Sequence, residues 1–151
     1  MKQKKKKSII IVYTTGVFDL IHPGHLNLLK KAKALGDKLI VGIQDDESVK
    51  KQKNKKPIMN CDQRMAMIEA LPFVDIVLSY TDIDQRKILN LIKPDIVVQG
   101  GDWLETGDRS LIIEYLKNNN IRLVQFPYTK GISSTEIKKR VYSDFLKNKK
   151  I

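Results

Sequence analysis

The sequence contains a single cysteine, Cys61, so it has no second thiol for an intramolecular disulfide. An unpaired cysteine fits a reducing compartment, and we expect a cytoplasmic protein. No apolar stretch approaches the ~20 residues that are needed to span a bilayer. A basic run at residues 1–7 precedes only six mostly apolar residues, and no small-residue cleavage site follows them. The sequence therefore predicts neither a membrane span nor a signal peptide.

Several common catalytic motifs are also absent. There is no G-x-G-x-x-G after the first apolar segment, which argues against a dinucleotide-binding dehydrogenase. There is no G-x-x-x-x-G-K-[ST] and no G-x-S-x-G, which excludes a P-loop enzyme and the nucleophile elbow of the hydrolases. The two histidines, His22 and His25, have no clear third metal ligand at a useful spacing, so we predict no protein-bound metal.

Most of the net positive charge lies at the two ends of the chain. The net charge is +11, and eight lysines within residues 2–7 and 147–150 leave only +3 for the rest. We expect a disordered basic tail at residues 1–7, a single domain at residues 8–146 and a basic tail at residues 147–151. A nucleic-acid-binding module is an alternative, but the tails lack interleaved aromatic and arginine side chains. We therefore do not expect nucleic acid as a partner.

Five short apolar segments, rich in β-branched residues, alternate with amphipathic ones. This order predicts an α/β fold, a doubly wound five-stranded parallel sheet with helices on both faces. The strands are expected at residues 8–13, 38–43, 75–79, 95–99 and 121–126. The helices are expected at about residues 26–35, from a cap at Asn60 or Asp62 to 71, from a cap at Asp82 or Asp84 to 92, 108–116 and 133–145. Residues 44–60 read as a long polar loop, and Ile137, Val141 and Phe145 as core positions of the last helix.

Ligands of such sheets bind outside the carboxyl ends of the strands. Four segments that could contribute to a functional site follow predicted strands. They are residues 14–25, the lysine-rich loop after Ile43, residues 100–103 and residues 129–135. In the first of them, His22 and His25 bracket a Pro-Gly pair where a helix is predicted to begin. A helix N-terminus attracts anions, so the two imidazoles are predicted to serve a phosphate, although they could merely cap and pack. No activated nucleophile is evident, which favours phosphoryl or nucleotidyl transfer by direct in-line attack.

The segments Gly16-Val-Phe-Asp19, His22-Pro-Gly-His25 and Gly131-Ile-Ser-Ser-Thr135 together resemble the cytidylyltransferase-like nucleotidyltransferase superfamily, over residues 13–140. The resemblance implies a Rossmann-like fold, a homodimer and Mg²⁺ that accompanies the nucleoside triphosphate. It implies catalytic roles at the triphosphate for His22, His25, Lys51 and Arg64. It implies nucleotide binding by Thr15, Gly16, Val17, Phe18, Asp19, Gly24, Gly100, Ser133, Ser134 and Thr135. It implies substrate binding by Lys53, Asp102, Trp103, Thr129 and Lys130.

Two members of the superfamily are similar to this chain. Lys51-Gln-Lys53 and Gly101-Asp-Trp103 resemble glycerol-3-phosphate cytidylyltransferase, whereas residues 46–50, 63–66 and 93–102 resemble the adenylyltransferase domain of ADP-heptose synthesis. Thr129-Lys130 stands where the cytidylyltransferases usually carry Arg-Thr, and Gly101 stands where the glycerol-phosphate enzymes tend to carry Asp. We expect CMP transfer from CTP to a phosphorylated alcohol such as glycerol 3-phosphate. The alternative is transfer from ATP to a sugar phosphate, heptose 1-phosphate.

Overall fold

A five-stranded parallel sheet forms the centre of the molecule. The computed structural model describes residues 8–81 and 84–149. The strands are β1 (Ile11–Gly16), β2 (Lys38–Gln44), β3 (Ile76–Tyr80), β4 (Ile96–Gly100) and β5 (Arg122–Phe126). They lie in the order β3-β2-β1-β4-β5 and all pair in parallel. The chain order therefore reverses direction at β1 and β4, and this junction is where such sheets bind ligands.

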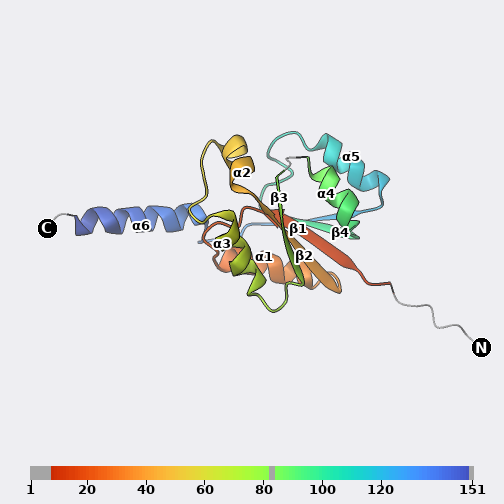
Figure 1. Cartoon of the computed structure of the whole chain (residues 1–151), viewed down its shortest axis with the longest axis horizontal. Coiled ribbons are helices and arrows are strands. Elements are labelled where there is room, and N and C mark those ends of the chain that lie inside the picture. The colour runs from red at the N-terminus through yellow and green to blue at the C-terminus, as the bar shows by residue number, and fades with distance from the viewer. Residues whose placement is uncertain (1–7, 82–83, 150–151) are drawn as a thin grey trace, which may run out of the picture.

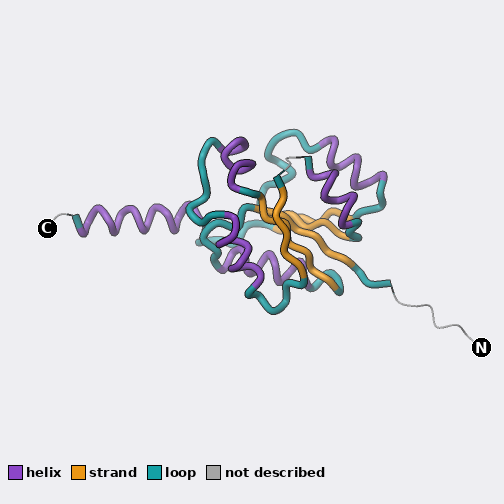
Figure 2. The backbone as a smooth tube through the Cα atoms, in the orientation of Figure 1, coloured by secondary structure: helices purple, strands orange, loops and turns teal. Residues whose placement is uncertain are grey.

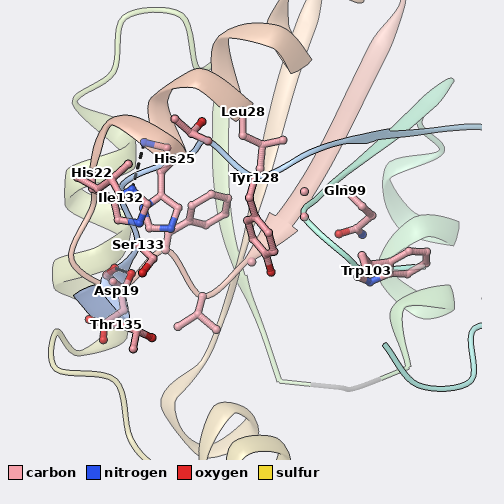
Figure 3. Close-up of a pocket in the computed structure, with 18 of the residues that line it drawn as sticks. Asp19, His22, His25, Leu28, Gln99, Trp103, Tyr128, Ile132, Ser133 and Thr135 are labelled. Carbon is pink, nitrogen blue, oxygen red and sulfur yellow. Dashed lines mark hydrogen bonds between the residues drawn. The ribbon is translucent and has the colours of Figure 1, made fainter. Parts of the chain in front are cut away.

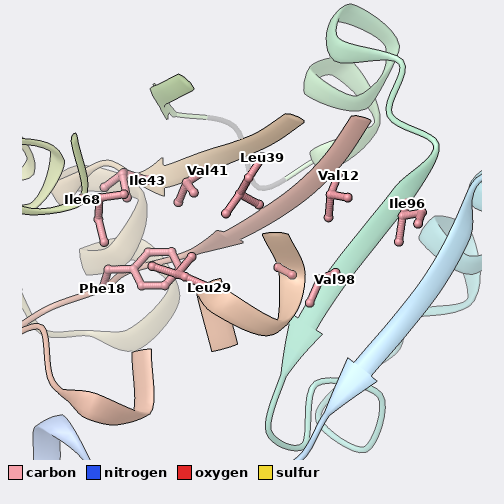
Figure 4. Packing of buried hydrophobic residues seen from close by; sticks show 10 residues of the cluster. Val12, Phe18, Leu29, Leu39, Val41, Ile43, Ile68, Ile96 and Val98 are labelled. Carbon is pink, nitrogen blue, oxygen red and sulfur yellow. The ribbon is translucent and has the colours of Figure 1, made fainter. Parts of the chain in front are cut away.

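Helices cover both faces of the sheet (Figure 1). They are α1 (Pro23–Lys33), α2 (Asp46–Lys53), α3 (Cys61–Glu69), α4 (Gln85–Ile92), α5 (Ser110–Asn118) and α6 (Ser134–Asn148). Along β1, Val12 packs in the cluster with α1 and α3, and Tyr13 packs on the opposite face with α4 and α5. Figure 4 shows the first cluster. The predicted fold class is confirmed, because strands with both faces covered must be apolar at consecutive positions.

The strand β1 is shifted along the sequence from its predicted position. It begins at Ile11 and continues to Gly16, where Thr14, Thr15 and Gly16 pair with Val41, Gly42 and Ile43 of β2. The hydroxyl-bearing residues were expected to belong to the turn because they are not apolar. As part of the strand, they bring its carboxyl end directly to the turn that holds the histidines.

The expectation of a loop at residues 44–60 is wrong, because α2 lies within it. Asp45 caps this helix by accepting a hydrogen bond from the backbone N–H of Ser48 at 2.8 Å, and Asn54 ends it in the left-handed conformation. Only Ser48 and Val49 are buried. A helix with so short an apolar side has almost no periodic signal in the sequence, and its capping residues were the usable sign.

The last helix does not face the core as predicted. In α6 the side chains of Val141 and Phe145 are 65% and 54% exposed, and no residue of the helix is buried. The helix projects away from the body of the molecule (Figures 1 and 2). It also continues to Asn148, so Lys147 belongs to a helix rather than to a tail. The predicted tail at residues 1–7, residues 150–151 and the possible cap Asp82 lie outside the described residues.

Among the described residues, no helix is both long enough and apolar enough to cross a membrane.

A buried arginine joins α3 to the turn that follows β1. Arg64 is fully buried, and its guanidinium donates to the carbonyls of Val17 at 2.6 Å and Met59 at 3.0 Å. It also donates to the Asp46 carboxylate at 2.7 Å. Because every one of these acceptors belongs to a different segment, a single cation links the turn, the connection before α3 and the start of α2.

Replacing Arg64 with methionine should destabilise the protein strongly. Methionine retains most of the apolar volume but leaves two carbonyls and a carboxylate without their donor. We expect the free energy of unfolding to fall by about 3 kcal/mol or more, measured by urea denaturation. The control is Arg86→Met, which removes a surface ion pair with Asp84 and should leave the midpoint almost unchanged. An Arg64→Met protein as stable as the control would show that the guanidinium does not hold these segments together.

Candidate active site

A cavity of about 460 Å³ opens at the carboxyl ends of β1 and β4. Each of the four segments that the sequence analysis placed at strand ends contributes to its lining. The predicted site residues in the lining are Thr15, Gly16, Val17, Phe18, Asp19, His22, Gly24, His25, Lys53, Gly100, Trp103, Thr129, Ser133, Ser134 and Thr135. The cavity is therefore formed where residues far apart in the sequence meet at one edge of the sheet (Figure 3).

The two histidines lie at the start of α1. His22 is its N-cap, and its Nδ1 accepts a hydrogen bond from the backbone N–H of Gly24 at 3.1 Å. The rings of His22 and His25 stack with their centroids 3.8 Å apart. A Cβ on Gly24 would lie 2.9 Å from the His22 ring, so glycine is needed there. Because Nδ1 of His22 is an acceptor, the proton of the neutral ring is on Nε2, which remains available as a donor.

Both imidazoles are held in the neutral form. Burial lowers the pKa of His25 to about 4, and the neighbouring His22 contributes to this shift. Burial also lowers the pKa of His22. The Nδ1 atom of His25 is buried and has no hydrogen-bond partner among the described residues. A polyanion bound here would favour protonation of these rings, so the pair can supply positive charge when a phosphate arrives.

The turn between β1 and α1 has a strained backbone. Phe18 and Leu20 have φ angles of 53° and 50°, a region that residues with a side chain seldom occupy. Between them, the Asp19 carboxylate accepts hydrogen bonds from the backbone N–H groups of Ile58 at 2.9 Å and Met59 at 3.0 Å. Asp19 thus stabilises the conformation of the turn, and its carboxylate already binds donors of the protein itself.

Asp19 also fixes the start of α6 against the turn. Lys138 forms an ion pair with its carboxylate at 2.9 Å, and the Ser134 hydroxyl donates to its carbonyl at 2.6 Å. Burial alone would raise the pKa of Asp19, but the hydrogen bonds from Met59, Ile58 and Lys138 outweigh it and lower the pKa. The carboxylate therefore remains ionised.

The N-terminus of α6 lines the cavity beside the histidines (Figure 3). Ser133 caps it by accepting from the backbone N–H of Glu136 at 3.1 Å, and its hydroxyl proton is still available to a ligand. The Ser134 hydroxyl is taken by Asp19, so of the three predicted hydroxyls Ser133 and Thr135 are the ones that can serve a phosphate. Two helix N-termini thus border the same cavity, an arrangement that favours an anion.

Four lysines line this end of the cavity: Lys53, Lys55, Lys56 and Lys138. Burial lowers the pKa of Lys53, and the positive charges of Lys55 and Lys138 lower it further. Like charges gather in this way where an anionic ligand offsets their repulsion. Sequence reasoning missed Lys138 as a cavity residue, and its position one turn after the hydroxyl run was the only sign.

Four predicted site residues do not line the cavity. Arg64 lies behind the turn, where carbonyls use its donors, so it can only position the site and cannot contact a ligand there. Lys51 is two residues before Lys53 on a helix, and about 200° of rotation directs it elsewhere. Asp102 accepts a hydrogen bond from the Tyr128 hydroxyl at 3.0 Å, and Lys130 is exposed beside the cavity.

The other end of the cavity is mainly aromatic, and Lys31 lies there over the Phe126 ring, 5.3 Å from its centroid. Trp103 and Tyr128 line this end, together with Gln99 and two glycines (Figure 3). Gly101 has a φ of +72°, and a Cβ there would lie 2.1 Å from the Tyr128 ring. Glycine therefore allows the ring to lie across the backbone. The cavity as a whole suits an elongated ligand with an anionic end and a flat end.

A family model described as cytidylyltransferase-like matches residues 13–140. The chain belongs to the cytidylyltransferase-like family. This membership makes it a nucleotidyltransferase with the Rossmann-like fold of that family.

Similar proteins include bifunctional proteins named HldE. The one from Campylobacter jejuni subsp. doylei is 37% identical over 142 residues, which are 93% of this chain and 29% of the relative. The one from Shewanella sp. strain ANA-3 is 41% identical over 104 residues, which are 68% of this chain and 22% of the relative. The chain therefore spans less than a third of the length of these relatives.

Solved structures agree with the family. A lipopolysaccharide core biosynthesis protein from Thermoplasma volcanium superposes with a TM-score of 0.71 at 31% identity, over 82% of this chain and all of that one. A pantoate-β-alanine ligase from Francisella tularensis gives a TM-score of 0.54 at 18% identity, over 91% of this chain and 71% of that one. The second likeness concerns the fold alone.

The low pKa of His25 predicts a specific loss of stability in mild acid. The pKa is about 4 in the folded protein and about 6.5 in an unfolded chain. The unfolded state therefore binds a proton first, and stability falls as the pH drops from about 6.5 towards 4, by up to roughly 3 kcal/mol. Urea denaturation at pH 7.5, 6.5, 5.5 and 4.5 should show this slope, and His25→Asn should reduce it. Equal slopes for the two proteins would contradict the assignment.

Proposed function

We propose that this nucleotidyltransferase transfers a nucleoside monophosphate from a nucleoside triphosphate to a small phosphorylated acceptor and releases pyrophosphate. An oxygen of the acceptor phosphate attacks the α-phosphorus, and the bond from that phosphorus to the β-phosphate oxygen breaks. The observation that supports the proposal best is the cavity with two different ends, whose electropositive end holds the stacked histidines and a second helix N-terminus. Such a site acts by positioning the reactants and by stabilising the charge that develops.

The chain's own groups divide this work. The Nε2–H of His22 and the ring of His25 are proposed to contact the phosphates at the start of α1. Thr135 and the hydroxyl of Ser133 are proposed to bind the β- and γ-phosphates at the start of α6. Lys53 supplies positive charge from the end of α2. As negative charge grows on the departing pyrophosphate, these donors are already in place and need no reorganisation.

The proposed donor is ATP, and the proposed acceptor is a sugar phosphate such as heptose 1-phosphate. The relatives named HldE support adenylyl transfer. Three segments of this chain resemble the adenylyltransferase domain of ADP-heptose synthesis, and the match with the Campylobacter jejuni HldE extends over 93% of this chain. The lipopolysaccharide core biosynthesis protein from Thermoplasma volcanium also supports a sugar substrate.

Transfer of CMP from CTP to glycerol 3-phosphate is the second candidate. The segment Gly101-Asp-Trp103 supports it, because it resembles the glycerol-phosphate enzymes in sequence and Trp103 lines the cavity. The segment Lys51-Gln-Lys53 gives weaker support, because only Lys53 lines the cavity.

Mg²⁺ is proposed to arrive with the triphosphate. Among the described residues, no three His, Cys, Asp or Glu side chains gather in a way that could hold a metal ion. The phosphate oxygens themselves are suitable ligands for Mg²⁺, which keeps several waters and needs few protein ligands. The ion would neutralise part of the triphosphate charge while the histidines and lysines bind the remainder.

Pyrophosphate release from each nucleoside triphosphate, tested with a panel of phosphorylated acceptors, is the direct assay. We expect release with ATP and a sugar phosphate, and CTP with glycerol 3-phosphate tests the second candidate in the same plate. His22→Ala should lower kcat by roughly 100-fold or more while the protein stays folded, because it removes a donor at the phosphates. No release with any pair would refute the proposal, and full activity of His22→Ala would refute the role of that residue.

We also propose a homodimer in which the outer halves of α6 from two copies pack together. The helix is exposed on every side beyond its first turns. Four of its large apolar side chains are exposed to solvent: Val141, Tyr142, Phe145 and Leu146. A lone helix of this length is only marginally stable in water, so a covering partner would stabilise it.

The double variant Val141→Lys, Phe145→Lys should turn the dimer into a monomer, as measured by light scattering after gel filtration. Leu91→Lys is the control, since Leu91 is 77% exposed on α4 and should leave the mass unchanged. A monomeric wild type, or a dimer that survives the double variant, would rule out this interface.

A further inference from the structure

Gln99 has an unused hydrogen-bonding group inside the cavity. It lies in β4, next to the end of the strand, and is 3% exposed. Its Nε2 is buried and has no hydrogen-bond partner among the described residues, although the side chain belongs to the cavity lining. A buried amide donor without a partner is unfavourable, because it has lost its hydrogen bonds to water and gained none. A ligand that fills the cavity would supply the missing partner.

A neighbouring glutamine shows what a structural role looks like in this sheet. Gln125 is the register partner of Gln99 on β5. Its Oε1 accepts from the backbone N–H of Leu104 at 2.9 Å, and its Nε2 lies 3.3 Å from both carboxylate oxygens of Glu105. The carboxamide of Gln125 is thus used by the protein, whereas the Nε2 of Gln99 is left for something else.

The surroundings of Gln99 suit a flat, uncharged group. Gln99 lies with Trp103 and Tyr128 at the end of the cavity away from His22 and His25 (Figure 3). The Tyr128 ring is fixed by its hydrogen bond to Asp102 and by the absence of a side chain at Gly101. Aromatic side chains are the usual platforms on which nucleobases stack. The other end of the cavity, in contrast, holds the two histidines with Lys53 and Lys138.

We propose that the Gln99 carboxamide binds the nucleobase of the triphosphate and pairs with an exocyclic amino group and the ring nitrogen beside it. This inference rests on the proposed nucleotidyl transfer and adds the residue that recognises the base. A carboxamide presents a donor and an acceptor side by side, and glutamine pairs in this bidentate way with adenine. Cytosine also carries an amino group next to a ring nitrogen, so either proposed donor nucleotide satisfies the pairing.

A base fits this position better than a phosphate does. A neutral amide adds no charge for an anion, and four of the five lysines of the lining lie at the other end of the cavity. The fifth, Lys31, lies over the Phe126 ring. The sugar of the acceptor is the remaining occupant, and its hydroxyls could also accept from Nε2. The two occupants differ in one measurable respect, since only base recognition depends on which nucleotide is supplied.

The test compares Gln99→Leu and Gln99→Glu with the wild type in their dissociation constants for ATP, CTP, GTP and inorganic tripolyphosphate. Leucine removes both hydrogen bonds, so the amino-base nucleotide that the wild type prefers should bind about 5- to 150-fold more weakly. Tripolyphosphate occupies only the charged end, and its affinity should not change. Glutamate offers acceptors alone, which match the two adjacent N–H donors of guanine, so preference should move towards GTP. Gln85→Leu, outside the cavity, is the control.

Three results would overturn the inference. Equal weakening of tripolyphosphate by Gln99→Leu would indicate a structural role. A rise in the KM for the acceptor alone would place the sugar at Gln99. Unchanged base preference in Gln99→Glu would exclude contact with the base. A wild type that binds nucleotides with Gln99-dependent preference but releases no pyrophosphate would refute the proposed reaction and support base recognition, so the two failures are distinguishable.

Discussion

The buried carboxylate of Asp19 is the interaction on which the site depends. This carboxylate accepts hydrogen bonds from two backbone N–H groups of the segment before α3 and from Lys138 of α6. The backbone carbonyl of Asp19 accepts another from the Ser134 hydroxyl. One residue therefore connects the turn after β1 with chain segments about 40 and about 115 positions away. A buried charge is tolerated only when it is well paired, and these partners keep it ionised despite its burial. Without it, the walls of the cavity would lose their common point of attachment.

Arg64 acts with Asp19 on the same turn from the other side. Its guanidinium binds the Val17 carbonyl, so the backbone on both sides of the left-handed Phe18 is held by buried charges. The strain of that conformation is offset by these contacts, and the turn delivers His22 to the start of α1 in a fixed position. The histidines thus owe their geometry to residues that do not contact the ligand. This separation explains why Arg64 resembles a catalytic arginine in sequence and yet lies behind the site.

The sequence was sufficient for the parts of the fold that have a strong periodic or local signal. Five continuous apolar segments predicted the parallel sheet, and parallel strands bring their carboxyl ends to one edge, which placed the histidines beside the Gly131–Thr135 segment. It failed where the signal was ambiguous. An amphipathic pattern in α6 cannot distinguish a core-facing helix from one that projects from the body. The lysine-rich sequence of α2 has a single apolar residue, so the helix was not predicted. Lys51 was for this reason expected in the site, although the helix directs it elsewhere. Gln99 could not be found from sequence, because its significance lies in an unpaired atom.

The central claim is that the cavity positions an acceptor phosphate for one direct displacement at the α-phosphorus, with no covalent intermediate on the enzyme. The stereochemical course of the reaction tests this most directly. The substrate is a nucleoside 5′-triphosphate made chiral at the α-phosphorus by sulfur, and the configuration of the product is read by phosphorus NMR with an oxygen isotope label. A single in-line attack predicts inversion at that phosphorus. Retention would mean two successive displacements through an enzyme-bound nucleotide and would contradict the account.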